Sequence, residues 1–86
     1  MSSLRAFIEM TDADRASGAR RLLDDPLAMG ILSVLEHDAV NAMIEAETDQ
    51  GRREARDTVR TVRAFRQALV QQVKLAQEAM RVPRVV

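Results

Sequence analysis

The sequence contains no cysteine, tryptophan or tyrosine, and only two of its 86 residues are phenylalanine. The absence of cysteine excludes disulfides and thiolate metal sites. Because aromatic side chains are so scarce, aliphatic residues and alanine must fill the interior. A chain of this length buries only about 60% or a little more of the surface that its unfolded form exposes. We therefore expect one domain over residues 1–86, with a thin core that other subunits complete.

Motifs that carry chemistry are also missing. The sequence has no phosphate-binding glycine loop, nucleophile elbow or facing pair of carboxylates. His37 is the only histidine, and it lacks the ligands of a metal site or the nucleophile of a triad. Asp12 and Asp14 resemble the opening of a calcium loop, but Ala16 occupies the third ligand position. We predict a protein that is not an enzyme, with no catalytic, cofactor-binding or metal-binding residues.

Targeting segments and long apolar runs are absent as well. The start of the chain lacks the basic segment, apolar run and cleavage site of a secretory signal. No stretch approaches eighteen uninterrupted apolar residues. These absences predict a soluble protein without a membrane partner.

Helix breakers are few, since the chain has only two prolines and three glycines, and the abundant alanine favours helix. We predict an all-α fold. Asp25 followed by Pro26 indicates a helix start, because aspartate caps the first N–H groups and proline fits the first helical position. The pattern predicts helices over 26–47 and 52–81, separated by a polar break.

That break is TDQG, residues 48–51, in which Thr48 or Asp49 is the expected cap. The last helix should end before Pro83. Its length of about 45 Å, at about 1.5 Å per residue, exceeds the diameter of roughly 30 Å expected for a compact domain of this size. We therefore expect an elongated antiparallel helical hairpin.

The N-terminal segment, residues 1–25, should add one or two short helices. Ser3 is the expected cap of a helix over 3–10, and Thr11 with Asp14 indicates a second start, running to about Asp24. The sequence leaves open whether these form one helix or two.

The apolar stripe of the helix over 26–47 changes direction along its length. A drifting stripe indicates burial on more than one side, against the same chain and against a neighbour. It begins with Leu27, Ile31, Val34 and Leu35 and continues with Ala39, Ala42, Met43 and Ala46. This pattern favours a homo-oligomer.

The formal net charge of zero conceals opposite charges in the two halves of the chain. Residues 1–50 carry ten acidic side chains and four arginines, a balance of −6, whereas residues 51–86 carry nine basic and three acidic side chains, a balance of +6. Placed on a helix, the basic residues of the last segment fall on one side, opposite Ala55, Val62, Phe65, Leu69, Val73, Ala76 and Met80. We call six of them the arginine stripe: Arg52, Arg53, Arg56, Arg60, Arg63 and Arg66.

The arginine stripe is our candidate nucleic-acid-binding site. Guanidinium groups stay charged and match phosphate oxygens, so the stripe could follow the backbone of double-stranded DNA without reading its sequence. About six phosphate contacts would give a salt slope of roughly −5 in log affinity. Two other interpretations stay open: solvated arginines paired locally, with Asp57 between Arg53 and Arg60, and arginines that bind acidic protein surfaces.

The layout resembles small helical proteins encoded in the head and DNA-packaging gene clusters of tailed bacteriophages, including small terminases. The resemblance is carried by SLRAFIEM (3–10), LLDDPLAMGILSVLEHDAV (22–40), ETDQGRREAR (47–56), and TVRAFRQAL followed by KLA (61–76).

This resemblance implies a homo-oligomeric packaging protein in the host cytoplasm that contacts viral DNA beside the large terminase or the portal. The chain lacks an obvious helix-turn-helix unit, so specific site recognition is not expected. The alternative is a structural connector or head-assembly protein of the virion, whose basic face binds acidic protein surfaces.

Overall fold

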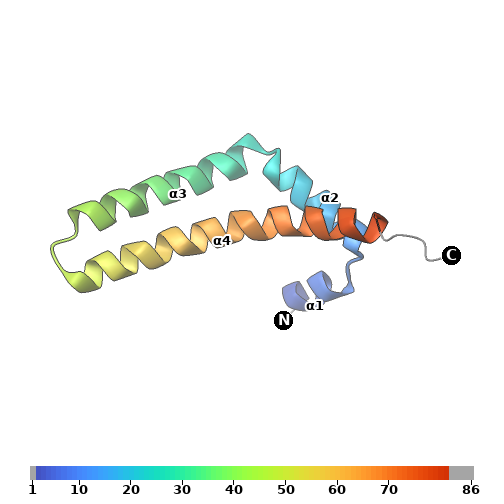
Figure 1. Ribbon diagram of the computed structural model, residues 1–86, viewed down its shortest axis with the longest axis horizontal. Helices are drawn as coiled ribbons and strands as arrows, with labels where there is room; N and C mark the ends of the chain where they lie inside the picture. The colour runs from blue at the N-terminus through green and yellow to red at the C-terminus, as the bar shows by residue number, and fades with distance from the viewer. Residues whose placement is uncertain (1, 82–86) are drawn as a thin grey trace.

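The computed structural model describes residues 2–81, which form four helices and no strand. These are α1 (Ser2–Glu9), α2 (Asp12–Leu23), α3 (Pro26–Glu45) and α4 (Asp49–Met80). The molecule measures 61 × 30 × 27 Å (Figure 1). The predicted all-α class and elongated shape are confirmed.

Helix α4 is the rod on which the other helices are arranged. Helix α3 returns along its N-terminal half as an antiparallel hairpin, and α2 packs against its C-terminal half (Figure 1). Helix α1 has no extensive contact with another helix. The fold is therefore a three-helix assembly with a fourth helix projecting from it.

The N-terminal residues form two helices, which answers the question that the sequence left open. Helix α1 already includes Ser3, so this residue is not the predicted cap. Helix α2 starts as predicted, because Thr11 Oγ1 accepts a hydrogen bond of 3.0 Å from Asp14 N. Helix α3 is capped by Asp25, whose Oδ1 accepts a 2.9 Å bond from Leu27 N.

The hairpin break lies at residues 46–48 rather than at 48–51, and α3 ends at Glu45. Thr48 is the cap of α4, and its Oγ1 accepts a 3.0 Å bond from Gly51 N. A Cβ atom at position 51 would lie 3.1 Å from that oxygen. Gly51 thus makes room for the cap inside the first turn instead of ending a helix, which is why the predicted start at residue 52 was late.

The core consists of small side chains only. Its buried members are Ala16, Ala19, Ala39, Ala55, Val59 and Val62. Phe65 and Met80, which we placed on the packing face, are 50% and 88% exposed. At about 100° per residue, Phe65 lies roughly 80° around the helix from Ala55, and the contact between helices lined with alanine and valine is too narrow to cover it.

Helix α3 has two apolar faces. The face toward α4 includes buried Ala39 and half-buried Met43, while Ala42 is exposed. The predicted early stripe is exposed instead, with Leu27 at 70% and Ile31 at 52%. The apolar stripe that changes direction along α3 in the sequence thus corresponds to two faces in the structure. One face packs on α4, and the other is exposed.

Helix α3 is also long and apolar enough, by length and composition, to cross a membrane. We had counted uninterrupted apolar residues, and this count misses a helix with a few polar positions. Its Glu36 accepts hydrogen bonds from arginines of α4. Helix α4 is rich in charged residues, and placing it in hydrocarbon beside α3 would be costly. The absence of a membrane partner stays a prediction.

Candidate nucleic-acid interface

All six residues of the arginine stripe lie on α4, but they fall into three groups. Arg52 lies at the hairpin loop, Arg63 and Arg66 contact α3, and Arg53, Arg56 and Arg60 lie between these positions. Among residues 2–81, only the middle group has no hydrogen-bond or ion-pair partner for its side chains.

Glu36 of α3 binds two arginines of α4. Arg63 Nε donates to Glu36 Oε2 at 2.7 Å, and Arg66 Nη1 donates to Glu36 Oε1 at 3.0 Å. The two arginines are three residues apart, so they lie on the same side of the helix. We call this arrangement the Glu36 clamp.

The electrostatics of the Glu36 clamp favour the ionised carboxylate. The hydrogen bonds from Arg63 and then Arg66 hold the pKa of Glu36 below its usual value, against a smaller opposing effect of burial. Both carboxylate oxygens accept hydrogen bonds, so the clamp joins the two helices of the hairpin and offsets part of the positive charge of Arg63 and Arg66.

Arg52 closes the hairpin loop. One of its terminal nitrogens donates to the carboxylate of Asp49, and Nη1 donates to the carbonyl oxygen of Ala46 at 3.1 Å. This side chain thus satisfies a carbonyl at the end of α3 that has no intrahelical partner. Arg52 has a structural role that the sequence did not indicate.

Arg53, Arg56 and Arg60 form what we call the free arginine tract. Within residues 2–81 none of them has a hydrogen bond or ion pair from its side chain, and all are exposed. In particular, Asp57 does not pair with Arg53 or Arg60 in this structure. Next to the loop, Arg53 and Arg56 line a hollow of about 460 Å³ together with Met43, Asp49 and Arg52.

The expectation that the whole stripe faces away from its own protein was therefore wrong for half of its members. A helical projection gives the direction of each side chain around α4, but the partner on α3 is set by the register of the hairpin. The missed residue is Glu36, and its signal was present in the sequence. Glu36 is the one acidic residue among the half-buried positions Met29, Leu32, Glu36, Val40 and Met43, which recur at helical spacing along α3.

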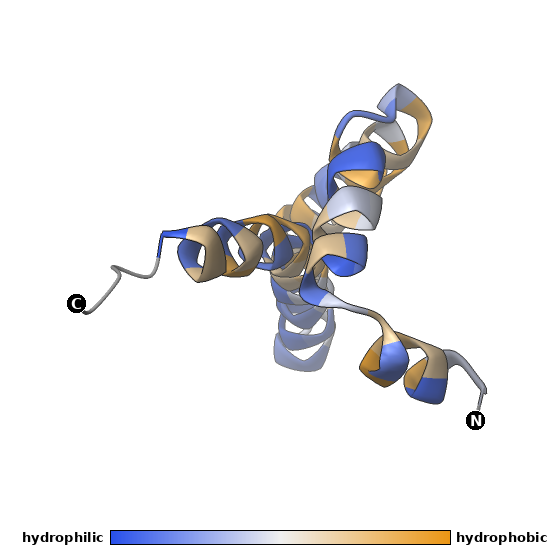
Figure 2. Ribbon diagram, turned by 90° about the vertical axis from the view of Figure 1, so that its right-hand side faces the viewer, coloured by the Kyte–Doolittle hydropathy of each residue, from blue (hydrophilic) through white to orange (hydrophobic). Residues whose placement is uncertain are grey.

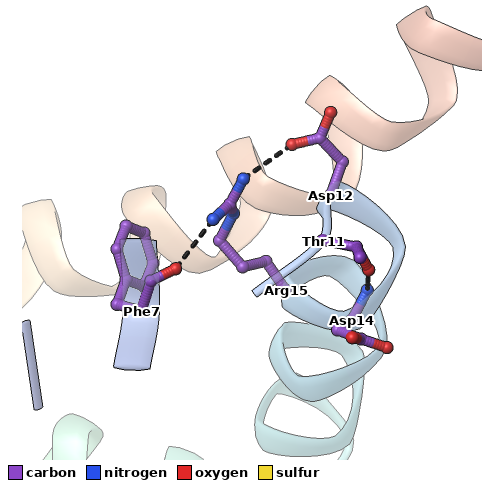
Figure 3. Close-up of polar contacts among 5 residues, drawn as sticks. All are labelled: Phe7, Thr11, Asp12, Asp14 and Arg15. Carbon is purple, nitrogen blue, oxygen red and sulfur yellow. Dashed lines mark hydrogen bonds and ion pairs between the residues drawn. The ribbon is translucent and has the colours of Figure 1, made fainter. Parts of the chain in front are cut away.

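Arg15 makes structural contacts that the sequence did not reveal. It donates from Nη1 to the carbonyl oxygen of Phe7 at 2.7 Å and from Nη2 to Asp12 Oδ1 at 2.7 Å (Figure 3). Its guanidinium carbon also lies 5.1 Å from the centre of the Phe7 ring, within cation–π range. These contacts connect α1 to α2.

The remaining polar candidates do not form a site. The exposed His37 ring lies 3.1 Å, through Nε2, from Asn41 Nδ2 on its own helix. Over the described part of the chain, no group of three or more histidine or acidic side chains could hold a metal ion.

Exposed large apolar side chains occur on all four helices, and two groups of them share one face of their helix. On α1 they are Leu4, Phe7 and Ile8, and on the open face of α3 they are Leu27, Ile31, Val34 and Leu35. Figure 2 shows α1, next to the N label, standing apart from the other helices with apolar residues along it. Contiguous apolar surface of this kind marks sites of association.

Comparisons of the chain with protein-family models, with curated proteins and with solved structures give no match. The free arginine tract and the exposed apolar faces are the features of the described residues that point to a function.

Proposed function

We propose that this chain is a non-enzymatic, homo-oligomeric DNA-packaging protein of the small-terminase kind, which contacts the backbone of double-stranded DNA through Arg53, Arg56 and Arg60. The observation that carries the proposal is the free arginine tract: three guanidinium groups on one exposed helix edge, without carboxylate partners among residues 2–81.

The spacing of the tract suits a phosphate backbone. Residues 53 to 60 span about 10 Å at about 1.5 Å per residue. Phosphates of one strand of duplex DNA are separated by about 3.4 Å along the helix axis, so the tract extends over about three phosphate intervals, one for each arginine. Residues 53–60 contain no asparagine or glutamine, the side chains that read adenine, which favours binding that depends on charge and not on sequence.

The oligomeric part of the proposal is supported by the distribution of apolar residues. Among residues 2–81, none of the buried residues is larger than valine, whereas thirteen large apolar side chains are exposed. A chain with more large apolar groups outside than inside gains stability when copies cover each other's surfaces. Repetition of the tract around an assembly would multiply the number of phosphate contacts.

Binding of duplex DNA measured over a range of salt concentrations tests this function. Log affinity should fall by about 0.9 per log unit of salt for each phosphate neutralised, so one bound subunit contributes a slope of about −2.7. Two duplexes of unrelated sequence should give the same slope. A failure to bind either duplex at low salt would refute the DNA-contacting role.

A second candidate is a structural connector or head-assembly protein whose basic face binds acidic protein surfaces. The Glu36 clamp favours it, because it shows arginines of this face bonded to a protein carboxylate. Such a protein would belong to the virion and would bind an acidic partner at the tract with no affinity for duplex DNA. For the DNA-packaging function proposed first, the large terminase and the portal are the further proposed partners. The proposed location is then the host cytoplasm.

A further inference from the structure

The open face of α3 has a shallow apolar depression that the other described residues do not cover. We call it the α3 groove; it has a volume of about 340 Å³ and is lined by Pro26, Leu27, Gly30, Ile31, Val34 and Leu35. Nearly all of its lining is apolar, and it lies on the side of α3 away from the face that packs on α4. An apolar groove of this kind fits an amphipathic helix.

Gly30 points to a close-packed occupant. Glycine inside a helix is less stable than alanine, and a Cβ atom added at this position would meet no atom of the chain within 4 Å. Contacts within the described chain therefore do not account for the glycine. An incoming helix that packs closely against α3 would account for it, because the missing side chain lowers the floor of the groove.

Helix α1 has the shape to occupy the groove. Its eight residues extend about 12 Å, and the ten residues that bound the groove extend about 15 Å. Leu4, Phe7 and Ile8 form one exposed apolar face on α1. Bulky side chains on one helix would thus fit against the apolar face of the other. Leu4 and Ile8 are largely exposed in the single chain, and Arg15 covers part of the Phe7 ring.

The charges at the two ends of the groove decide which partner fits. Asp25 precedes it and Asp38 follows it by one turn, and both are exposed. Two α3 helices packed face to face would bring these carboxylates of one copy close to those of the other, and like charges repel. Helix α1 carries Arg5 beside its apolar face, together with Glu9 one turn later, so only an orientation that brings Arg5 and not Glu9 next to Asp38 pairs opposite charges.

We propose that α1 of one copy docks in the α3 groove of the next copy, with Arg5 directed toward Asp38. This inference rests on the proposed homo-oligomeric function and names the contact that builds the oligomer. Each copy donates one helix and receives one, so the interface is head-to-tail and generates a ring or a filament. Arg15 holds the donated helix through the carbonyl of Phe7.

Complementation between two variants tests the contact. Ile31→Glu places a charge in the α3 groove and leaves α1 unchanged. Ile8→Glu places a charge on the apolar face of α1 and leaves the groove unchanged. Each variant alone should sediment as a monomer at micromolar concentration. Their equimolar mixture should form a one-to-one dimer that grows no further, because only one of the two contacts can be made.

Matched controls separate the contact from general damage. Ile31 and Ile8 are exposed, and circular dichroism should show unchanged helix content. Ser33→Glu on α3 and Ala6→Glu on α1 place the same charge on exposed positions outside the two faces and should assemble like the unmodified chain. Val34→Glu should reproduce the effect of Ile31→Glu.

Charge exchange gives a second readout. Arg5→Glu should weaken assembly several-fold, and adding Asp38→Arg in the same chain should restore it. Loss of assembly with Arg5→Glu that the second change fails to restore would contradict the assigned orientation of α1.

Several results would overturn the inference. If Ile8→Glu assembles like the unmodified chain, α1 is not the occupant, and pairing between α3 helices is indicated. If the unmodified chain assembles and the mixture stays monomeric, the contact is wrong, while the proposed function keeps its own test in the salt dependence of DNA binding. If the unmodified chain is a monomer, both the contact and the proposed oligomer fail.

Discussion

The two parts of the arginine stripe differ in what surrounds them. Arg63 and Arg66 lie opposite Glu36 of α3 and donate to its two carboxylate oxygens. Arg53, Arg56 and Arg60, on the same helix and of the same residue type, have no carboxylate partner within the region that the structure describes. One part therefore stabilises the hairpin, and the other is available to a ligand.

This difference shows that a row of like charges on a helix is not one functional unit. Charge that is already hydrogen-bonded to a carboxylate contributes little to attraction of a polyanion. The same amino-acid type thus performs two tasks within a few turns, and variants of the two parts should separate them.

The largest expected effect comes from removing the free arginine tract. Replacing Arg53, Arg56 and Arg60 by alanine should reduce the salt slope of duplex binding by about 2.7 per bound subunit, with unchanged helix content. The matched control removes two exposed cations from α2, by Arg20→Ala and Arg21→Ala, and should leave the slope close to that of the unmodified chain. An equal loss in both variants would mean that net charge alone drives binding.

The next effect should come from releasing the clamped arginines. Glu36→Gln removes the charge of the acceptor at nearly constant volume, so two guanidinium groups become available to phosphate. The salt slope should steepen by up to about 1.8 per bound subunit, while the melting temperature falls. A slope that stays the same with a lower melting temperature would show that position along α4, and not pairing, limits DNA contact.

Removing the clamp from the other side should affect stability but not DNA binding. Arg63→Ala with Arg66→Ala leaves Glu36 without its donors, so the midpoint of thermal unfolding should fall. The salt slope should change little, in contrast to the variant of the free arginine tract. A large change of slope would contradict the division of the stripe.

Acid should weaken the hairpin through the same clamp. The two arginines lower the pKa of Glu36 in the folded chain, so the folded state binds this proton less readily than the unfolded state does. The stabilisation is present above the usual glutamate pKa of about 4.3 and is lost as the pH falls through the lower folded value. Denaturant unfolding of the unmodified chain and of Glu36→Gln should therefore converge below about pH 4.3; parallel pH profiles would argue against the clamp.

The smallest effects should come from the helix caps. Asp25→Ala and Thr48→Ala each remove an acceptor for N–H groups of a first turn and should each cost about 1 kcal/mol of unfolding free energy. Neither change alters an arginine, so the salt slope should stay constant. A cap variant that altered the slope would show that the hairpin positions the tract.

The sequence predicted the helices well because their signals are local. Asp25 with Pro26, and Thr11 with Asp14, act through bonds between neighbouring residues, and the structure contains those bonds. Gly51 was misread because its role depends on the hydroxyl of Thr48 one turn earlier.

The candidate site was predictable only in part. Periodicity places the arginines together on α4, but Glu36 lies 27 residues before Arg63, and no local rule specifies such a pairing. Phe65 was assigned to the core because it is apolar, whereas the core is built from alanine and valine and leaves this ring outside. Contacts between helices, and not the helices themselves, are what the sequence does not reveal.

The most direct test of the DNA-contacting role is a titration of the protein with a short duplex at low salt, followed through the NMR signals of the arginine Nε–H groups. Our account predicts that the signals of Arg53, Arg56 and Arg60 shift with added duplex while those of Arg63 and Arg66 stay in place. Equal shifts of all five, or shifts of the clamped pair alone, would contradict it.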